Sequence, residues 1–387
     1  MVTTSRADYG VYVPLLKMIQ DDPDLSLHLI VGGMHLSSEF GSTVRIIEQD
    51  GFEIVARVDM LSPSDDPEGI AQSMGQGVIE FSRVYSEHRP DILIVLGDRF
   101  EMYSAALAAL PHKIPVAHIH GGEITRGAID DALRHSMTKL AHLHFVSAKE
   151  YARRVIQLGE EPWRVTVSGA PALDNLRTLQ LPSADQLEQE FGLDLGHFPL
   201  LVTFHSVTLE FEQTEWQTGE LMAALESSGM PVVFTAPNAD TGGRIISAEI
   251  DRQVQNHPEW RLVDNLGTPN YFALMKVSAA MVGNSSSGMV EAALFGLPVV
   301  NIGTRQEGRL RNSNILDVGY RRDEILQGIR KAASPEFRHQ ASQVDDLYGD
   351  GHAAERIVDV LKNVPLDDHL IMKQFVDQPQ VSAGVTR

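Results

Sequence analysis

The sequence contains no cysteine among its 387 residues. This absence excludes disulfide bonds, thiolate metal sites and cysteine nucleophiles. No stretch reaches the roughly 18 successive apolar residues that a membrane-spanning helix needs, and residues 1–6 lack the long apolar run of a secretory signal peptide. The sequence therefore predicts a cytoplasmic protein with no membrane partner.

Basic residues are scarce. The chain has 32 lysines and arginines against 52 aspartates and glutamates, which gives a formal net charge of −20. Such a surface repels the phosphates of nucleic acids and anionic membranes, so no nucleic-acid partner is expected. An anionic ligand would have to be held locally, by a few arginines and by helix N-termini.

Several nucleotide and metal motifs are also missing. There is no G-x-x-x-x-G-K-[ST] loop and no G-x-G-x-x-G that follows a strand, which argues against the usual nucleoside triphosphate and dinucleotide sites. His118 and His120 have strand spacing but lack a third ligand, so hydrogen-bonding roles are expected for them. Neither a metal nor a cofactor is predicted.

Short apolar runs alternate with helical patterns along the chain, which is typical of parallel α/β layering. The predicted strands are 27–31, 53–57, 92–96, 116–119, 143–146, 165–167, 200–203, 232–235, 260–263, 280–282 and 299–301. Predicted helices include 11–20, 69–88 and 102–110. The pattern indicates two similar α/β units, whose strand ends would face each other across a cleft.

Glycine and proline interrupt the pattern at 168–171 and again near 182, which places the domain boundary between these points. We expect an N-terminal Rossmann-like domain at 1–175 and a C-terminal one at 176–352. The tail at 365–387 shows little pattern and is expected to be partly disordered. Only Val2, Thr3 and Thr4 precede the first polar cluster, so the first strand is either very short or lacks residues upstream.

Two polar clusters follow the first strands. In residues 5–10 a strand-to-helix turn would direct backbone N–H groups and Arg6 at an anion; the alternative is a helix N-cap by Asp8 with Arg6 solvated. His35, after the second strand, either reaches a ligand or is an idle, solvent-exposed histidine.

Asp98, Arg99 and Glu101 follow the very apolar run 92–95, which indicates a central strand. Charges at the carboxyl end of a central strand favour a site. The alternative is a capped helix start with an Asp98–Arg99 pair.

The stretch 118–135 combines glycines, carboxylates and histidines between a predicted strand and a predicted helix. Gly121 and Gly122 would let the backbone approach a ligand closely, directly before Glu123. Asp131 and His135 share a helix face as an i, i+4 pair. The alternative is that Asp130 and Asp131 only complement the helix dipole. Convergence of Asp98, Glu123 and Asp131 would supply the paired carboxylates of acid–base catalysis.

In the second half, His205 closes one predicted strand and residues 283–291 follow another. There, Ser285, Ser286 and Ser287 begin a predicted helix, so that hydroxyls, N–H groups and the helix dipole suit a diphosphate. The alternative is an ordinary serine N-cap. Glu291 is placed to accept from a ribose diol, and Arg305 adds a cation after the next strand.

Taken together, these motifs resemble the hydrolysing UDP-N-acetylglucosamine 2-epimerases of sialic acid synthesis. The matching segments, in order, are 6–9, 97–99, 121–123, 129–131 with 134–135, 138–142, 283–286 and 301–306. The resemblance implies the glycosyltransferase-B fold, with a C-terminal helix near 353–364 that completes the first domain. Two departures are the short first strand and Ser206, where related chains are expected to carry proline.

The resemblance also implies roles for individual residues. Asp98, Glu123 and Asp131 would be the catalytic carboxylates, with Glu123 and Asp131 handling protons while His120 and His135 orient groups. The substrate-binding residues would be Arg6, Asp8, His35, Arg99, His120, His135, His205, Ser285, Ser286, Ser287, Glu291 and Arg305.

The implied reaction converts UDP-N-acetylglucosamine and water to N-acetylmannosamine and UDP, in a homodimer or homotetramer. Four alternatives stay open: the same reaction on a 2,4-diacetamido-2,4,6-trideoxy sugar nucleotide, a non-hydrolysing 2-epimerase, a glycosyltransferase that shares the fold, and a sugar-nucleotide sensor that does not turn over. No acceptor site is identifiable for a glycosyltransferase, which makes it the weaker of the enzyme alternatives.

Overall fold

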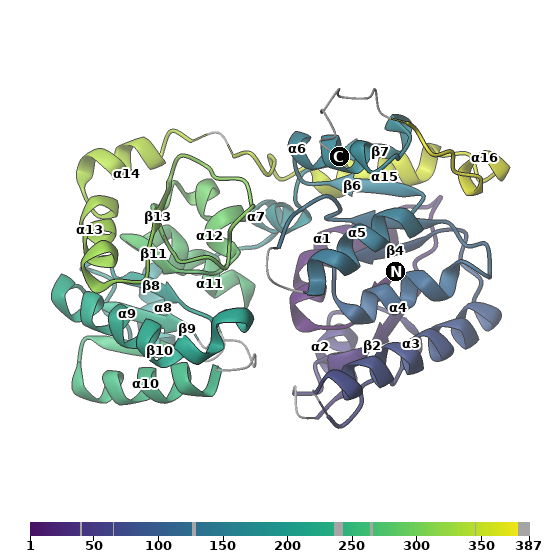
Figure 1. Ribbon diagram of the computed structural model, residues 1–387. Coiled ribbons are helices and arrows are strands. Elements are labelled where there is room, and N and C mark those ends of the chain that lie inside the picture. Colours follow the sequence, from purple (N-terminus) through teal and green to yellow (C-terminus); the bar gives the residue numbers. More distant parts are fainter. Residues whose placement is uncertain are drawn as a thin grey trace, which may run out of the picture. The chain divides into compact units, whose positions relative to one another are not determined.

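A computed structural model describes residues 1–38, 41–64, 66–125, 129–235, 243–263, 266–344 and 346–377. The chain divides into two compact units. The first comprises Met1–Glu123, Ile129–Asp174 and Gly351–Arg387, and the second comprises Ile124–Ala128 and Asn175–Asp350. Both units are α/β, and every strand pair of the described residues is parallel (Figure 1). The predicted fold class, parallel α/β layering in two halves, is confirmed.

Unit 1 contains a three-stranded sheet in the order β1-β2-β3 and a four-stranded sheet in the order β4-β5-β6-β7. The strands are β1 (Val2–Thr3), β2 (Leu29–Gly32), β3 (Ile54–Val58), β4 (Leu93–Leu96), β5 (Val116–Ile119), β6 (Leu143–Val146) and β7 (Val165–Val167). The helices are α1 (Arg6–Asp21), α2 (Val44–Gln49), α3 (Pro67–Glu87), α4 (Phe100–Ala109), α5 (Ile129–Leu140), α6 (Lys149–Gln157), α15 (Ala353–Asn363) and α16 (Asp368–Ile371). Short 3₁₀ turns lie at η1 (Gly33–Leu36), η2 (Pro162–Arg164) and η3 (Pro171–Asp174).

Unit 2 contains one six-stranded sheet in the order β10-β9-β8-β11-β12-β13. Its strands are β8 (Leu200–Thr203), β9 (Val232–Thr235), β10 (Trp260–Val263), β11 (Ala280–Gly283), β12 (Val299–Ile302) and β13 (Ile315–Val318). Its helices are α7 (Asn175–Thr178), α8 (Ala184–Phe191), α9 (Thr214–Ser228), α10 (Gly243–Asn256), α11 (Gly267–Val277), α12 (Ser287–Val290), α13 (Arg322–Ala332) and α14 (Pro335–Ala341), with 3₁₀ turns at η4 (Thr208–Gln213) and η5 (Ala292–Phe295).

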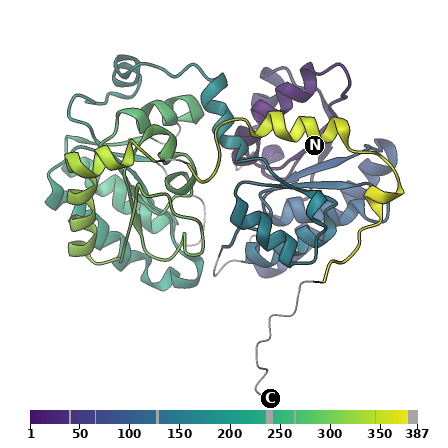
Figure 2. The same ribbon diagram turned by 90° about the horizontal axis from the view of Figure 1, so that it is seen from above.

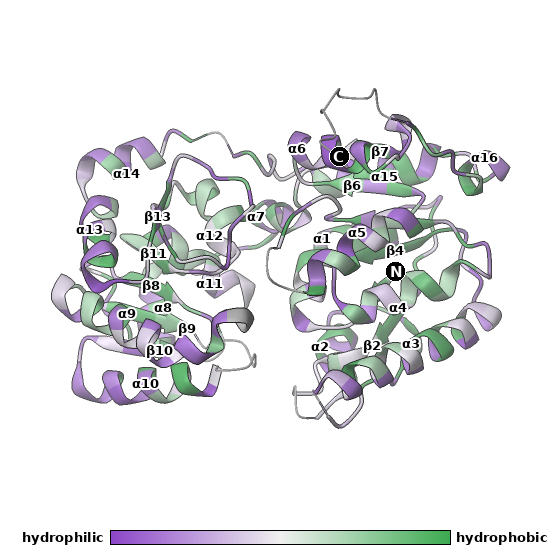
Figure 3. Ribbon diagram, viewed as in Figure 1, coloured by the Kyte–Doolittle hydropathy of each residue, from purple (hydrophilic) through white to green (hydrophobic). Residues whose placement is uncertain are grey.

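The central strands form because their residues are buried on both faces, as parallel sheets covered by helices require. All four residues of β4 and of β11 are buried, and the strands are coloured as hydrophobic in Figure 3, whereas hydrophilic residues predominate on α6 and α10. None of the described helices combines the length and the apolar character that a membrane crossing requires.

Two strands depart from simple sequence patterns. The first strand is very short in the structure: Val2 and Thr3 pair with Ile30 and Val31 of β2. The edge strand β13 was not predicted, because Asp317 interrupts its apolar run. The Asp317 carboxylate accepts a hydrogen bond from Asn301 Nδ2 at 2.6 Å, which ties this edge strand to β12.

Helix α15 belongs to unit 1 although it follows unit 2 in the sequence, and it packs beside α1 (Figure 2). Its N-terminus is capped by Asp174, whose two carboxylate oxygens accept from the backbone N–H groups of Ala353 at 2.9 Å and Ala354 at 2.6 Å. Part of the tail that was expected to be partly disordered is ordered, since residues 367–377 include α16 and an extended segment. Residues 378–387 lie outside the described residues.

Candidate active site

The centre of the candidate site in unit 1 is an ion pair at the carboxyl end of β4. Arg134, on α5, donates to Asp98 Oδ2; the Arg134 side chain is 3% exposed and that of Asp98 is 21% exposed. The turn that presents Asp98 depends on Gly97, whose φ of +77° favours glycine. A buried arginine that neutralises a carboxylate fixes the position of both groups.

Asp131 lies beside the same arginine. Its Oδ1 is 3.7 Å from Arg134 Nη1, and its Oδ2 is 3.6 Å from His135 Nε2. The predicted i, i+4 proximity of Asp131 and His135 is thus confirmed. Arg134 thus lies close to the carboxylates of both Asp98 and Asp131.

Glu123 has a different set of partners. Its Oε1 contacts His120 Nδ1 at 2.7 Å and accepts from Ser147 Oγ at 3.1 Å, and the residue is 4% exposed. The preceding Gly122 has a φ of +78°, and a Cβ there would come within 2.5 Å of the Tyr151 carbonyl oxygen. The glycine is therefore needed to seat the loop that carries Glu123.

Asp130 joins this group, although sequence reasoning singled out its neighbour Asp131. Burial and the nearby Asp98 raise the pKa of Asp130 to about 6, against the opposing influence of Arg99 and Arg134. A carboxyl that titrates near neutral pH is a strong candidate for proton transfer. The signal in the sequence was the acidic pair itself, but its spacing does not show which member faces Asp98.

Arg99 and Glu101 form a pair that the sequence did not predict. Arg99 donates to Glu101 Oε2 at 3.2 Å and Oε1 at 2.9 Å, and Glu101 is fully buried. The alternative of an Asp98–Arg99 pair is therefore wrong: Asp98 pairs with Arg134 and Arg99 with Glu101. Glu101 raises the pKa of Arg99 although burial opposes it, so this cation stays charged.

Ser5, not Asp8, is the N-cap of α1, so the alternative of an Asp8 N-cap is wrong. Ser5 Oγ accepts from the Asp8 N–H, while Asp8 Oδ2 accepts from Thr4 Oγ1 at 2.7 Å and from the Ser5 N–H at 3.0 Å. Asp8 is buried in this capping box, and Arg6, in the first turn, is exposed.

His35 is fully buried, so the alternative of a solvent-exposed histidine is wrong. Its Nε2 is 2.9 Å from Thr3 Oγ1 and its Nδ1 is 2.7 Å from Thr43 Oγ1. Both ring nitrogens thus contact threonine hydroxyls of unit 1. Burial lowers the pKa of His35 to about 4, which keeps the ring neutral at pH 7.

His118 supports the turn at the end of β4. It is fully buried, and its Nε2 contacts the Gly97 carbonyl oxygen at 2.7 Å, directly before Asp98. Burial lowers the pKa of His118 to about 3, so the ring is neutral and Nε2 carries the donated proton. This contact agrees with the predicted hydrogen-bonding role.

In unit 2 the polar groups gather around Asn284, which follows β11. Asn284 Oδ1 accepts from the His205 N–H and its Nδ2 donates to the His205 carbonyl, each at 2.8 Å. Gly283 permits this approach, because its φ is +136° and a Cβ there would lie 2.0 Å from the Thr203 carbonyl oxygen. The Asn284 carbonyl accepts from Arg305 Nη1 at 3.1 Å and Gln306 Nε2 at 2.8 Å. Asn284 therefore holds together His205, after β8, and Arg305, after β12.

The serine segment after β11 leads into a short helix. Helix α12 has only four residues, and the 3₁₀ turn η5 follows Glu291, so a macrodipole contributes less than expected. Ser286 is exposed, and Ser285, Ser287 and Glu291 are half-buried. Sequence analysis did not identify Tyr271, on α11, whose hydroxyl lies near Ser285 and Ser287; burial raises the pKa of this hydroxyl to about 12.

A cavity of about 600 Å³ in unit 1 lies away from these groups. Its lining includes Leu27 and Ile92, which precede β2 and β4, so it opens at the amino ends of the strands. Ligands of parallel sheets bind at the carboxyl ends, where Asp98 and Glu123 lie. Within the described ranges no cluster of three His, Asp or Glu side chains has metal-binding geometry.

The chain also matches known proteins over nearly its whole length. The family model for UDP-N-acetylglucosamine 2-epimerase matches residues 17–362. The chain is 38% identical to the GDP/UDP-N,N'-diacetylbacillosamine 2-epimerase (hydrolyzing) of Campylobacter jejuni, with 97% of this chain and 98% of that protein covered. It is 35% identical to the UDP-N,N'-diacetylbacillosamine 2-epimerase (hydrolyzing) of Legionella pneumophila, with 96% and 97% covered.

A UDP-N-acetylglucosamine 2-epimerase of Neisseria meningitidis is 32% identical, with 97% of this chain and 98% of that protein covered. Among solved structures, UDP-GlcNAc 2-epimerase from Neisseria meningitidis bound to UDP-GlcNAc has a TM-score of 0.80 at 18% identity, with 93% of this chain and 98% of that chain covered. The predicted glycosyltransferase-B type of α/β fold matches these structures.

Proposed function

Because the chain belongs to the UDP-N-acetylglucosamine 2-epimerase family, we propose that it converts UDP-N-acetylglucosamine and water to N-acetylmannosamine and UDP. The protein is a hydrolysing UDP-sugar 2-epimerase, and the identity of the sugar is the finer part of the proposal. The observation that carries it is the group of carboxylates around Arg134, at the carboxyl ends of strands in unit 1.

Elimination is the first step of the proposed reaction. The bond between the anomeric carbon and the diphosphate breaks, UDP departs with the electron pair, and positive charge develops at the anomeric carbon. A carboxylate such as Asp98 stabilises that charge electrostatically. A second carboxylate removes the proton from carbon 2, which leaves a glycal with a double bond between carbons 1 and 2.

Hydration is the second step. Water adds to the anomeric carbon after loss of a proton to a base, and an acid delivers a proton to the opposite face of carbon 2. Glu123, Asp130 and Asp131 are our candidates for these transfers, and the pKa of Asp130, about 6, suits a group that both accepts and returns a proton near neutral pH.

Nucleotide binding is assigned to unit 2. We infer that Ser285, Ser286 and Ser287 hold the diphosphate with His205 and Arg305, and that Glu291 accepts from the ribose. The support is local: Asn284 bonds to the backbone of His205 and accepts from Arg305, so these groups are gathered at neighbouring strand ends. In unit 1, we assign Arg6 and Arg99 to contact with the sugar nucleotide.

A second substrate deserves a parallel test. The hydrolysing relatives at 38% and 35% identity are named for diacetylbacillosamine nucleotides, so a UDP-2,4-diacetamido-2,4,6-trideoxy sugar is the alternative. The reaction steps are the same for both sugars, and only the groups that face carbons 4 and 6 would differ.

The test incubates the protein with each UDP-sugar in deuterated water and follows products by NMR. We expect UDP and a free sugar with inverted configuration and deuterium at carbon 2, formed faster from UDP-N-acetylglucosamine. Preference for the diacetamido substrate would reassign the sugar. An intact epimerised UDP-sugar, or no reaction with either compound, would overturn the proposal.

A further inference from the structure

The C-terminal end of α5 is capped by a side chain from the far end of the sequence. Lys373 Nζ donates to the carbonyl oxygens of Lys139 at 3.0 Å and Ala141 at 2.6 Å, and more weakly to that of Thr138 at 3.4 Å. The last carbonyls of a helix have no partners within it, and a cation there also complements the helix dipole. Lys373 therefore satisfies the carbonyl groups at the end of α5.

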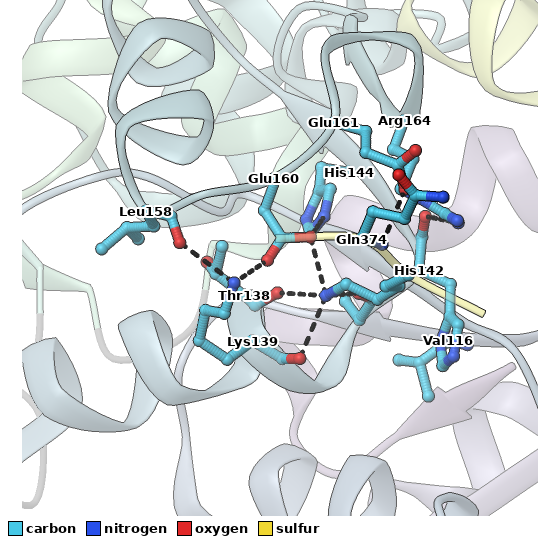
Figure 4. A network of polar contacts seen from close by, with 12 residues as sticks. Val116, Thr138, Lys139, His142, His144, Leu158, Glu160, Glu161, Arg164 and Gln374 are labelled. Atoms are coloured by element: carbon cyan, nitrogen blue, oxygen red, sulfur yellow. Dashed lines mark hydrogen bonds and ion pairs between the residues drawn. The ribbon is translucent and has the colours of Figure 1, made fainter. Parts of the chain in front are cut away.

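Glu160 is the anion that holds Lys373 in place. Its side chain is fully buried and pairs with Lys373 at 2.7 Å. It also pairs with His144 at 3.1 Å and with Lys139 of α5 (Figure 4). Burial alone would raise its pKa, but the hydrogen bonds from His144, Lys139 and Lys373 lower the pKa of Glu160 to about 2. The carboxylate thus stays charged at neutral pH and forms ion pairs with both Lys139 and Lys373.

Arg164 fixes the segment on the other side of Lys373. This fully buried arginine donates to the carbonyls of His369 and Leu370, each at 2.8 Å, and pairs with Glu161 at 2.7 Å. We call residues 369–376 the C-terminal clamp, since both of its ends are bonded to the loop between α6 and β7.

The far end of the C-terminal clamp is bonded to the same loop. The Val376 N–H donates to the Gly159 carbonyl at 2.9 Å. The ring of Phe375 packs so closely against Gly159 that a Cβ there would lie 2.4 Å from the ring. Lys139 Nζ is 4.9 Å from the centre of the same ring. A glycine at 159 is therefore what leaves room for the clamp.

Helix α5, which Lys373 caps, carries the candidate carboxylates. Asp130 and Asp131 lie in the first turn of α5, and Arg134 follows them. From Arg134 to Lys139 the helix rises only about 7.5 Å, so a change in the orientation of its last turn moves the carboxylates with it. A displacement on the order of 1 Å can cost about 100-fold in rate.

We propose that Lys373 is a positioning residue for the reaction: the C-terminal clamp fixes the orientation of α5 and thereby the placement of Asp130, Asp131 and Arg134. This inference rests on the proposed function for its effect on turnover. Its effect on the helix itself is independent of any substrate.

The experiment compares Lys373→Met with the wild type by hydrogen exchange of α5 amides and by steady-state kinetics. We expect exchange in 129–140 to become at least about 10-fold faster, because the cap is lost. We also expect kcat to fall about 10-fold or more while KM changes less than about 2-fold, because the nucleotide groups are in unit 2. Lys373→Arg, which keeps the charge and the donors, should restore most of both losses.

Lys362→Met is the matched control. Lys362 also lies in the C-terminal part of unit 1, on α15, but it pairs with Asp22, the C-cap of α1, and with Asp24 in the turn after it, each at 2.9 Å. Exchange in 129–140 and kcat should be unchanged in this variant.

Unchanged exchange and kcat in a folded Lys373→Met protein would overturn the inference. If that variant does not fold, Lys373→Gln replaces it, and faster exchange confined to 129–140 supports the inference, whereas a uniform change over unit 1 or no change contradicts it. A loss of helix protection in a protein that shows no turnover even as wild type would instead reject the proposed function alone.

Discussion

Arg134 donates to Asp98 across 36 positions of sequence and thereby joins α5 to the carboxyl end of β4. The arginine is 3% exposed, whereas Asp98 keeps 21% of its side-chain surface. Arg134 is thus buried in the protein, whereas Asp98 is partly accessible to a ligand. The pair therefore supports the fold of unit 1 and, in the proposed reaction, holds a catalytic carboxylate.

Arg134→Met should destabilise the protein by about 2–4 kcal/mol, because it leaves carboxylates without their buried counter-charge. Differential scanning calorimetry would measure the loss. Arg153→Met is the control: Arg153 is an exposed partner of Glu150 on α6, and its replacement should cost less than about 0.5 kcal/mol. Equal, small effects of both substitutions would contradict the assigned importance of the pair.

Asp131→Asn should keep UDP binding and lose turnover by at least about 100-fold, the usual contribution of an acid–base group. Titration calorimetry and a discontinuous product assay measure the two quantities. Asp130→Asn belongs in the same series, and Asp185→Asn, at an exposed acid of α8, is the control that should be unaffected. Near-normal turnover in the Asp131 variant beside a large loss in the Asp130 variant would move the proton role to Asp130.

The stability of the wild type should depend on Asp130 between pH 4 and 7. The pKa of this group is raised from 3.8 to about 6 in the folded protein, so its contribution is fully present below about pH 4 and is lost as the pH rises through 6. Relative to the wild type, Asp130→Asn should therefore gain stability from pH 4 to pH 7, on the order of 1–2 kcal/mol after allowance for solvent screening.

Thermal unfolding of both proteins over this pH range measures the difference. A constant offset between Asp130→Asn and the wild type would show that the pKa of Asp130 is not raised on folding.

Gly283→Ala should destabilise unit 2 by at least about 3 kcal/mol, because the added Cβ meets the Thr203 carbonyl oxygen at 2.0 Å and the φ of +136° is unfavourable for alanine. Gly219→Ala, in the exposed face of α9 with open space at the Cβ position, should instead stabilise by about 0.5–1 kcal/mol. Urea unfolding followed by tryptophan fluorescence would report both. A tolerated alanine at 283 would show that the Gly283–Asn284 turn is not constrained as described.

The order of strands and helices follows from local sequence. The mainly apolar runs at β4, β5, β6 and β8 predicted their strands, since strands buried on both faces are mainly apolar. The proximity of Asp131 and His135 was likewise predictable, because helical spacing alone puts them on one face. The family membership followed from motifs in a fixed order along the chain, without any contact between them.

The choice of partner for each charge was decided by the tertiary structure. Arg99 is adjacent to Asp98 in sequence but pairs with Glu101, while Asp98 is reached by Arg134. His35 looked like a loop histidine and is buried between two threonine hydroxyls. Its partners are 32 and 8 positions away, and no local pattern identifies them.

Local sequence was sufficient to predict the α/β class, the positions of most strands and the family, because these depend on periodicity and on motifs that are continuous in the chain. Only the fold shows that the pKa of Asp130 is raised and that Lys373 caps α5. The first depends on burial and on Asp98, and the second on Lys373, which is 235 positions from Thr138. The interaction between two charges depends on their distance in space, so it can be assigned only from a structure that shows which residues lie close together.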